Sequence, residues 1–159
     1  MEIIDYLDIY ENDVKELLLE LQEHISDIDI DGYNIVTDEY KNKYFNKTIK
    51  EVNKYEGKIL LAKENDEIVG LVVGLINNEE IDTYDFKAPK RGRITELIVS
   101  KKYRSKGLGK ILLNKMENHL NSVGCKCILL DVFAFNNRAI SFYENNGYYS
   151  RTMEMMKKL

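Results

Sequence analysis

Two glycines separated by one residue, Gly107 and Gly109, stand among basic side chains where a helical pattern begins. Glycine destabilises a helix interior by about 1 kcal/mol relative to alanine, so two of them in a first turn need a reason. A helix N-terminus has unpaired N–H groups and a partial positive charge, and glycine keeps side chains away from those groups. The pattern favours binding of a phosphate or pyrophosphate, with further charge from Arg104, Lys106 and Lys110.

Two common phosphate-binding motifs do not match this stretch. A Walker loop requires glycine where Arg104 stands and serine or threonine where Ile111 stands. The dinucleotide-binding fingerprint requires a small residue in place of Leu112, and its later acid would be Asp131, inside the next predicted strand. Both motifs are therefore disfavoured, and a generic turn or helix cap remains an alternative.

A second motif lies downstream of the glycine turn and makes the pattern more specific. It consists of Asn136, Ala139, Phe142, Tyr143, Gly147 and Tyr148. Together with the R-x-x-G-x-G turn of Arg104, Gly107 and Gly109, between a strand and a helix, it resembles the GNAT superfamily of N-acetyltransferases. The resemblance implies one α/β (α+β) domain whose mixed central sheet has about six to seven strands and about four flanking helices.

The resemblance also implies a reaction and a set of coenzyme contacts. An acetyl group would move from acetyl-CoA to a primary amine by direct attack in a ternary complex, with no metal. Backbone groups of Leu97, Ile98 and Val99 would pair with the pantetheine arm, and one N–H would face the thioester oxygen. Asn136, beside Ala139 and Tyr143, would bond the arm from the other side. The pyrophosphate would be held by the turn of Arg104, Ser105, Lys106, Gly107, Leu108, Gly109 and Lys110.

Tyr143 resembles the family's general acid. A thiol has a pKa of about 8.5 and a tyrosine of about 10, so a phenol beside the leaving sulfur can protonate it. The alternative for Tyr143 is a structural ring packed beside Phe142. Asn136 also has an alternative, which is to cap the helix that begins after it.

Glu96 is the candidate base, or the group that orients a base water. Strand alternation would place it on the face of Ile94 and Ile98. An acid in such an apolar strand is either buried with a partner or brought to the cleft by a bulge, and a structural salt bridge is the alternative role. Some family members resemble this chain but carry the acid at the position of Thr95.

Periodicity predicts the elements that must position these residues. The predicted helices cover 11–26, 37–57, 106–124 and 136–147, and Thr37 and Gly57 are the expected cap and stop of the second. The predicted strands cover 2–9, 93–100, 125–135 and 148–159, with a hairpin over 58–76 that turns at 64–66. One domain over 1–159 is expected, with an acceptor-side half (1–93) and an acetyl-CoA-binding half (94–159).

Composition sets the broad class. A chain of 159 residues with 44% hydrophobic residues can form one globular domain. An acidic N-terminus and the lack of a long apolar run predict a cytoplasmic protein without a membrane partner, and the net charge of −4 argues against nucleic acid. Cys125 and Cys127 are expected to be small reduced core residues, and His24 and His119 to be solvated. A monomer or a homodimer is expected.

Charge is distributed unevenly along the chain. Residues 1–40 hold 13 acidic side chains against the single base Lys15, whereas basic residues crowd 87–106. The acceptor site is expected in the first two helices and the 77–93 loop, so the acidic region, with Asp27, Asp29 and Asp31, predicts a cationic acceptor: an aminoglycoside, a polyamine or a peptide amine. The acids could instead only balance the basic coenzyme side.

Three functional classes follow from the sequence. An acetyl-CoA-dependent N-acetyltransferase is preferred because the binding motif and Tyr143 occur together. A non-catalytic acyl-CoA sensor or regulatory module would bind coenzyme without acetylating any amine. Another nucleotide-phosphate binder would bind nucleotides but no coenzyme A. No residue identifies the acyl chain, so propionyl or succinyl groups stay open.

Overall fold

The described residues form one sheet whose strands lie in chain order. The computed structural model describes residues 1–77 and 87–159. Neighbouring strands pair antiparallel as far as β4, and β4 pairs parallel with β5. The strands are β1 (Glu2–Asp5), β2 (Lys58–Glu64), β3 (Glu67–Asn77), β4 (Arg91–Val99) and β5 (Cys127–Leu129). The sheet is mixed, as predicted, but the described residues form fewer strands than predicted.

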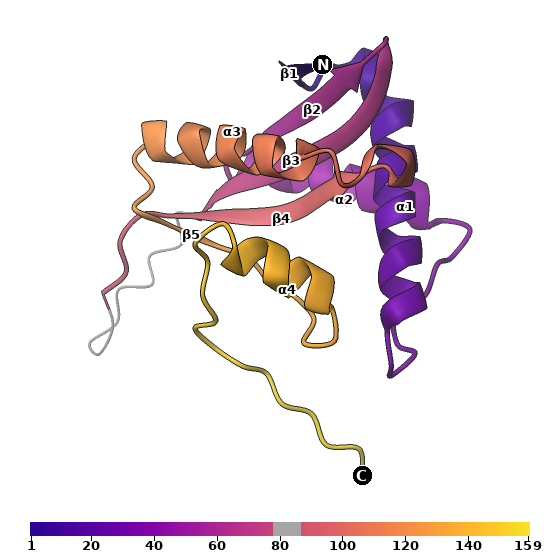
Figure 1. The fold of residues 1–159 in the computed structure, drawn as a ribbon, viewed down its shortest axis with the longest axis vertical. Helices are drawn as coiled ribbons and strands as arrows, with labels where there is room; N and C mark the ends of the chain where they lie inside the picture. The colour runs from indigo at the N-terminus through magenta and orange to yellow at the C-terminus, as the bar shows by residue number, and fades with distance from the viewer. Residues whose placement is uncertain (78–86) are drawn as a thin grey trace.

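Four α-helices of the described residues cover the two faces of this sheet. α1 (Glu11–Ile28) and α2 (Tyr40–Lys54) pack on one face, and α3 (Leu108–Ser122) packs on the other (Figure 1). α4 (Asn137–Glu144) joins the α3 side, where Phe142 and Tyr143 pack against the core beneath α3. Two short 3-10 turns precede α1 and α3, at Asp8–Tyr10 and Lys101–Tyr103.

α2 is shorter than predicted at both ends. Its N-cap residue is Glu39, which makes no side-chain cap bond, so Thr37 is not the cap. The left-handed residue after the helix is Glu56, with φ +48°. Gly57 serves packing instead, because a Cβ there would lie 2.6 Å from Leu75 and 2.7 Å from the carbonyl oxygen of Gly74. The hairpin turn between β2 and β3 forms where it was predicted.

β5 and the C-terminal segment differ from the prediction. β5 covers only three residues of the predicted 125–135, and Cys125, buried, precedes it while Cys127 is exposed. Only one of the two cysteines therefore lies in the core. The predicted strand over 148–159 does not form, and Tyr149, Met153 and Met155 are 82%, 81% and 86% exposed. Alternation predicts a strand only where a neighbouring edge can pair with it, and β5 offers a very short edge.

The predicted loop over 77–93 lies mostly outside the described residues, which resume at Lys87. Asn77 is the last residue of β3, and Arg91 is the first of β4. Among the helices of the described chain, none combines the length and the apolar character needed to cross a bilayer.

Candidate active site

The parallel pairing of β4 with β5 ends early, and the two chain segments then part. The last pair joins Arg93 to Leu129. Beyond that pair β4 continues beside β3 as far as Val99, whereas the chain after Leu129 leaves the sheet. An edge of β4 is therefore left without a strand partner among the described residues.

Along this open edge, the backbone N–H and C=O groups of successive residues point alternately toward β3 and away from it. The N–H of Ser100 donates to the carbonyl oxygen of Val69 in β3 at 2.9 Å. In an antiparallel ladder every second residue bonds the same neighbour, so the backbone groups of Ile98 also turn toward β3. Those of Leu97 and Val99 turn away from β3, toward the open edge.

A cavity of about 350 Å³ opens beside this edge at the N-terminus of α3. We call it the glycine-turn cavity. Its lining consists of Leu21, His24, Leu97, Ile98, Val99, Tyr103, Arg104, Ser105, Gly107, Leu108, Gly109, Lys110, Asn136, Arg138, Ala139, Phe142 and Tyr143. Every predicted coenzyme-contacting residue except Lys106 is in this set. Lys106 instead places its Nζ 5.1 Å from the ring centre of Tyr103.

Positions 107 and 109 are occupied by glycine for different physical reasons. Gly107 is the N-cap residue of α3 with φ +80°, a conformation that favours glycine. Gly109 lies in the helix, and a Cβ there would lie 3.5 Å from Phe142, which is ordinary contact. Atoms of the protein therefore do not require glycine at 109. Its absent side chain instead leaves the cavity wall open beside the first N–H groups of α3, as an anionic ligand would need.

Arg104 ties the turn to two neighbouring elements. Its Nε donates to the carbonyl oxygen of Val99 at 2.8 Å, and its Nη2 lies 3.0 Å from Glu20 Oε1 in α1. The same Glu20 oxygen accepts from the N–H of Lys101 at 2.7 Å. Arg104 thus holds the turn in place, and its remaining N–H donors are what it can offer to an anion.

The basic residues of 87–106 do not form one patch. A strand rises about 3.3 Å per residue, so β4 separates Arg91 from Lys101 by roughly 30 Å. At the distant end, Lys90 donates to the carbonyl oxygen of Val123 at 2.7 Å, and Arg93 pairs with Asp131. Only the basic residues after β4 lie near the glycine turn.

Asn136 is the N-cap residue of α4, so its predicted capping role is confirmed. Its side-chain oxygen accepts from the N–H of Ala139 at 3.1 Å. Both residues also line the glycine-turn cavity. Because the cap uses only the oxygen, the amide nitrogen of Asn136 remains a donor.

Tyr143 lies on α4 in the same lining, half-buried. Its ring makes edge contacts with Phe142 and Tyr148, at centroid distances of 5.2 and 5.5 Å. Burial raises the pKa of Tyr143 to about 12. The phenol is therefore protonated at neutral pH and can act as a proton donor.

A β-bulge in β4 decides the direction of Glu96. Glu96 pairs with Val73, and the next residue of β3 pairs with Ile94, so Thr95 is the extra residue. Across the bulge the alternation reverses: Ile94 packs in the core beneath α3, whereas Ile98 packs in the core of α1 and α2. The prediction that Ile94 shares the face of Glu96 is wrong, because counting by two fails across an extra residue.

The Glu96 carboxylate is buried, only 4% exposed, and has a donor on each oxygen. The Tyr44 hydroxyl donates to Oε1 at 2.8 Å, and the Thr95 hydroxyl donates to Oε2. The two predicted settings, a bulge and a buried acid with a partner, therefore occur together. Burial raises the pKa of Glu96, and the two hydroxyl donors oppose that rise. A carboxyl with a raised pKa is suited to accept a proton near neutral pH.

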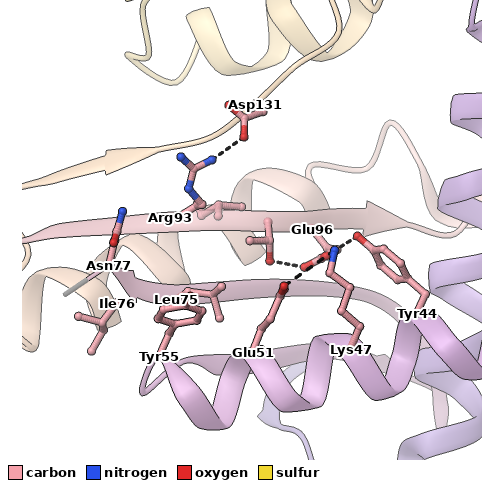
Figure 2. Close-up of a pocket in the computed structure, with 12 residues that line it drawn as sticks. Tyr44, Lys47, Glu51, Tyr55, Leu75, Ile76, Asn77, Arg93, Glu96 and Asp131 are labelled. Atoms are coloured by element: carbon pink, nitrogen blue, oxygen red, sulfur yellow. Dashed lines mark hydrogen bonds and ion pairs between the residues drawn. The ribbon is translucent and has the colours of Figure 1, made fainter. Parts of the chain in front are cut away.

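Glu96 lines a second cavity of about 390 Å³, which we call the α2–β4 cavity (Figure 2). Lys47 and Glu51 point into it from α2, with 3.8 Å between Nζ and Oε1. The Arg93–Asp131 pair borders the opposite side. Its lining consists of Tyr44, Lys47, Glu51, Tyr55, Leu75, Ile76, Asn77, Arg93, Ile94, Thr95, Glu96 and Asp131. Residues 93–96 of β4 thus line one cavity and residues 97–99 the other.

Several lining residues were not predicted from the sequence. Four of them recur at helical spacing along α2 and its C-cap residue, namely Tyr44, Lys47, Glu51 and Tyr55. This polar and aromatic stripe was a usable signal. His24 was expected to be solvated but lies half-buried in the glycine-turn cavity. Burial, aided by nearby arginines, lowers the pKa of His24. No local pattern indicated that α1 would reach this cavity.

The three aspartates predicted for the acceptor site, Asp27, Asp29 and Asp31, lie outside both cavities. Asp29 accepts hydrogen bonds from the backbone and side-chain N–H groups of Asn34 and from the N–H groups of Asp31 and Tyr33, which lower its pKa to about 2. Asp31 forms an ion pair of 2.9 Å with Lys158. Neither these two residues nor Asp27 line the two cavities described above. Within the described ranges, no group of three or more His, Cys, Asp or Glu side chains could hold a metal ion.

The sequence and the fold match those of known acetyltransferases. The family description "Acetyltransferase (GNAT) family" matches residues 18–148. An uncharacterised N-acetyltransferase of Bacillus subtilis is 32% identical over 102 residues, which cover 64% of this chain and 64% of that protein. N-alpha-acetyltransferase 60 of Xenopus tropicalis is 31% identical over 102 residues, covering 57% of this chain and 42% of that protein.

A solved structure supports the same fold. A crystal structure of a Bacillus halodurans protein superposes with a TM-score of 0.81 at 20% identity, covering 100% of this chain and 99% of the other. The chain belongs to the GNAT acetyltransferase family, and it carries an N-acetyltransferase domain of that family. The matches span 42% and 64% of the two curated relatives named above.

Proposed function

We propose that this protein transfers an acetyl group from acetyl-CoA to a primary amine by direct attack in a ternary complex. The observation that carries the proposal is the pair of cavities that adjoin along β4, one at a glycine turn and one around a buried carboxylate. Acetyl-CoA is proposed to occupy the glycine-turn cavity, and the amine the α2–β4 cavity.

The geometry of the glycine-turn cavity supports the proposed coenzyme contacts. The N–H groups at the start of α3 and the charge of Lys110 suit a pyrophosphate. The open-edge backbone of Leu97 and the N–H of Val99 suit an amide-bearing arm, with the Asn136 amide nitrogen as a further donor. The carbonyl oxygen of Val99 already accepts from Arg104 Nε. Most of this cavity comes from 94–159, which we propose as the coenzyme half of one domain over 1–159, although α1 adds two residues.

The proposed chemistry moves two protons. The amine nitrogen bonds to the acetyl carbon, and Glu96 takes the proton that the nitrogen gives up, directly or through a water. A backbone N–H at the open edge of β4 stabilises the oxyanion. As the carbon–sulfur bond breaks, Tyr143 donates its proton to the sulfur, whose conjugate thiol has a pKa of about 8.5.

The test is a panel of amines offered with acetyl-CoA while free thiol is measured. Thiol release that requires both the amine and acetyl-CoA supports the proposal. Coenzyme binding without acetylation of any amine would favour a sensor module instead, and nucleotide binding without coenzyme A binding would overturn the coenzyme assignment. Propionyl-CoA and succinyl-CoA in the same panel measure acyl-chain preference.

Gly109→Ala is expected to weaken coenzyme binding without weakening the fold. The added methyl group fits beside Phe142 and removes a helix-interior glycine, so stability should be unchanged or higher by up to about 1 kcal/mol. The Kd for acetyl-CoA should rise roughly tenfold, about 1.4 kcal/mol. Calorimetric titration and thermal unfolding measure the two effects. Gly107→Ala provides the contrast, because its positive φ makes that change destabilising.

We further propose that the acceptor is cationic. The α2–β4 cavity holds the carboxylates of Glu51, Glu96 and Asp131, and Asp131 is already paired with Arg93. Glu51 is only loosely paired with Lys47, so it is the carboxylate best placed to bind an ammonium group. Aminoglycosides, polyamines and peptide amines are the classes to compare.

Glu51→Gln is expected to raise the KM for a cationic amine roughly fivefold, with little change in kcat, because a partly exposed charge is lost from the binding cavity. Initial rates over a range of amine concentrations measure the change. Glu39→Gln is the matched control, since it removes an exposed acid at the start of the same helix. An equal KM in both variants would contradict the role of Glu51.

A further inference from the structure

We propose that Tyr44 is a positioning residue that, together with Thr95, fixes the Glu96 carboxylate for proton transfer. The inference rests on the proposed role of Glu96 as the base. Tyr44 lies in α2, far from β4 in the sequence, and belongs to neither the glycine-turn motif nor the motif of Asn136 and Tyr143.

The geometry is a clamp of two hydroxyls. Tyr44 donates to Oε1 at 2.8 Å, and Thr95, the bulge residue, donates to Oε2. Because the donors come from different elements, the carboxylate cannot rotate without losing one of them. An ionised carboxylate has about four acceptor positions, so each oxygen can still accept a proton from the amine or a water.

Tyr44 is itself held in place. Its ring stacks on Tyr40, one turn earlier in α2, with centroids 4.9 Å apart and an interplanar angle of 14°. Lys47 Nζ lies 5.4 Å from the Tyr44 ring centre. Burial and the nearby Glu96 carboxylate raise the pKa of Tyr44, so its hydroxyl remains a donor over the working pH range.

Several titratable groups, both neutral and charged, share the environment of the clamp. Tyr40, Tyr44, Lys47 and Glu51 come from α2, Arg93 from β4, and Asp131 follows β5. Tyr44→Phe changes none of these charges. It removes one donor from the carboxylate and retains the ring, so its effect isolates the hydrogen bond.

The test measures turnover and the Glu96 carboxyl in Tyr44→Phe. We expect kcat to fall roughly tenfold, the scale of one hydrogen bond to a charged group, with little change in the KM of the amine. Because the charged form of Glu96 loses a donor, the acidic limb of the pH–kcat profile should move to higher pH. A carbon-13 NMR titration of Glu96, assigned through Glu96→Gln, should move in the same direction without any turnover.

Tyr40→Phe is the matched control, because it removes a hydroxyl from the stacked neighbour one turn earlier in α2. It should leave the pH profile and the Glu96 titration as in the wild type. Thr95→Val should act like Tyr44→Phe, and Thr95→Ser, which keeps the hydroxyl, should restore the profile.

Two results would overturn the inference in different ways. An unchanged Glu96 titration and an unchanged pH–kcat profile in Tyr44→Phe would show that Tyr44 does not act on the carboxylate. Full turnover in Glu96→Gln would instead refute Glu96 as the base, and with it the reason for a positioning residue. The amine panel tests acetyl transfer itself independently of both.

Discussion

Tyr143→Phe is expected to lower kcat for acetyl transfer roughly a hundredfold or more, the usual scale of a lost general acid. Phenylalanine keeps the ring that packs against Phe142 and Tyr148, so the fold and the cavity wall should persist. The Kd for acetyl-CoA should change little, because only the hydroxyl is removed. Stopped-flow or steady-state thiol release, with coenzyme titration, measures both quantities.

Tyr148→Phe is the control for that result. Tyr148 contacts the Tyr143 ring and donates to Glu117 at 2.8 Å, but it does not line the glycine-turn cavity. Its loss should reduce the free energy of unfolding by about 1 kcal/mol and leave kcat near the wild-type value. If Tyr143→Phe also keeps its kcat, Tyr143 is a structural ring and another group protonates the sulfur.

Glu96→Gln should lower kcat by a similar factor, roughly a hundredfold, because glutamine cannot accept the proton. The wild-type rate should rise with pH as Glu96 ionises, at a pH above the ordinary glutamate range, since burial raises its pKa. That acidic limb should be absent in the variant. Rates measured across pH, at saturating amine and acetyl-CoA, test the prediction.

Stability provides an independent check on the same residue. A carboxyl whose pKa is raised in the folded state binds more protons there than in the unfolded chain. The wild type should therefore lose stability as pH rises from the ordinary glutamate pKa through the raised value. Glu96→Gln should lack this loss, so the Tm of the variant minus the Tm of the wild type should increase as pH rises. A constant difference in Tm would contradict a raised pKa of Glu96.

Local patterns were sufficient for most of the fold. Helical spacing of apolar residues predicted α1 and α3, and the polar turn between two β-rich runs predicted the β2–β3 hairpin. The errors in the predicted strands lie where a strand depends on a distant partner. β5 stops at Leu129, and the segment 148–159 alternates without finding an edge.

The candidate site, too, could be predicted from the sequence only in part. The glycines, Asn136 and Tyr143 stand in two short motifs, and the family resemblance of those motifs implied one shared coenzyme site. The face of β4 from which Glu96 projects could not be predicted from the sequence. The bulge residue Thr95 reverses the alternation of side chains that a regular strand would have.

The sequence by itself determined the family, the helix that begins at a glycine turn and the residues that carry both motifs. Only the tertiary structure decided that Tyr44 donates to Glu96 and that Glu20 pairs with Arg104. It also decided that the basic residues of 87–106 lie at opposite ends of β4. The physical reason is separation along the chain. Spacing within one element fixes which side chains share a face, whereas contacts between α2, α1 and β4 depend on how the cores on the two faces of the sheet pack.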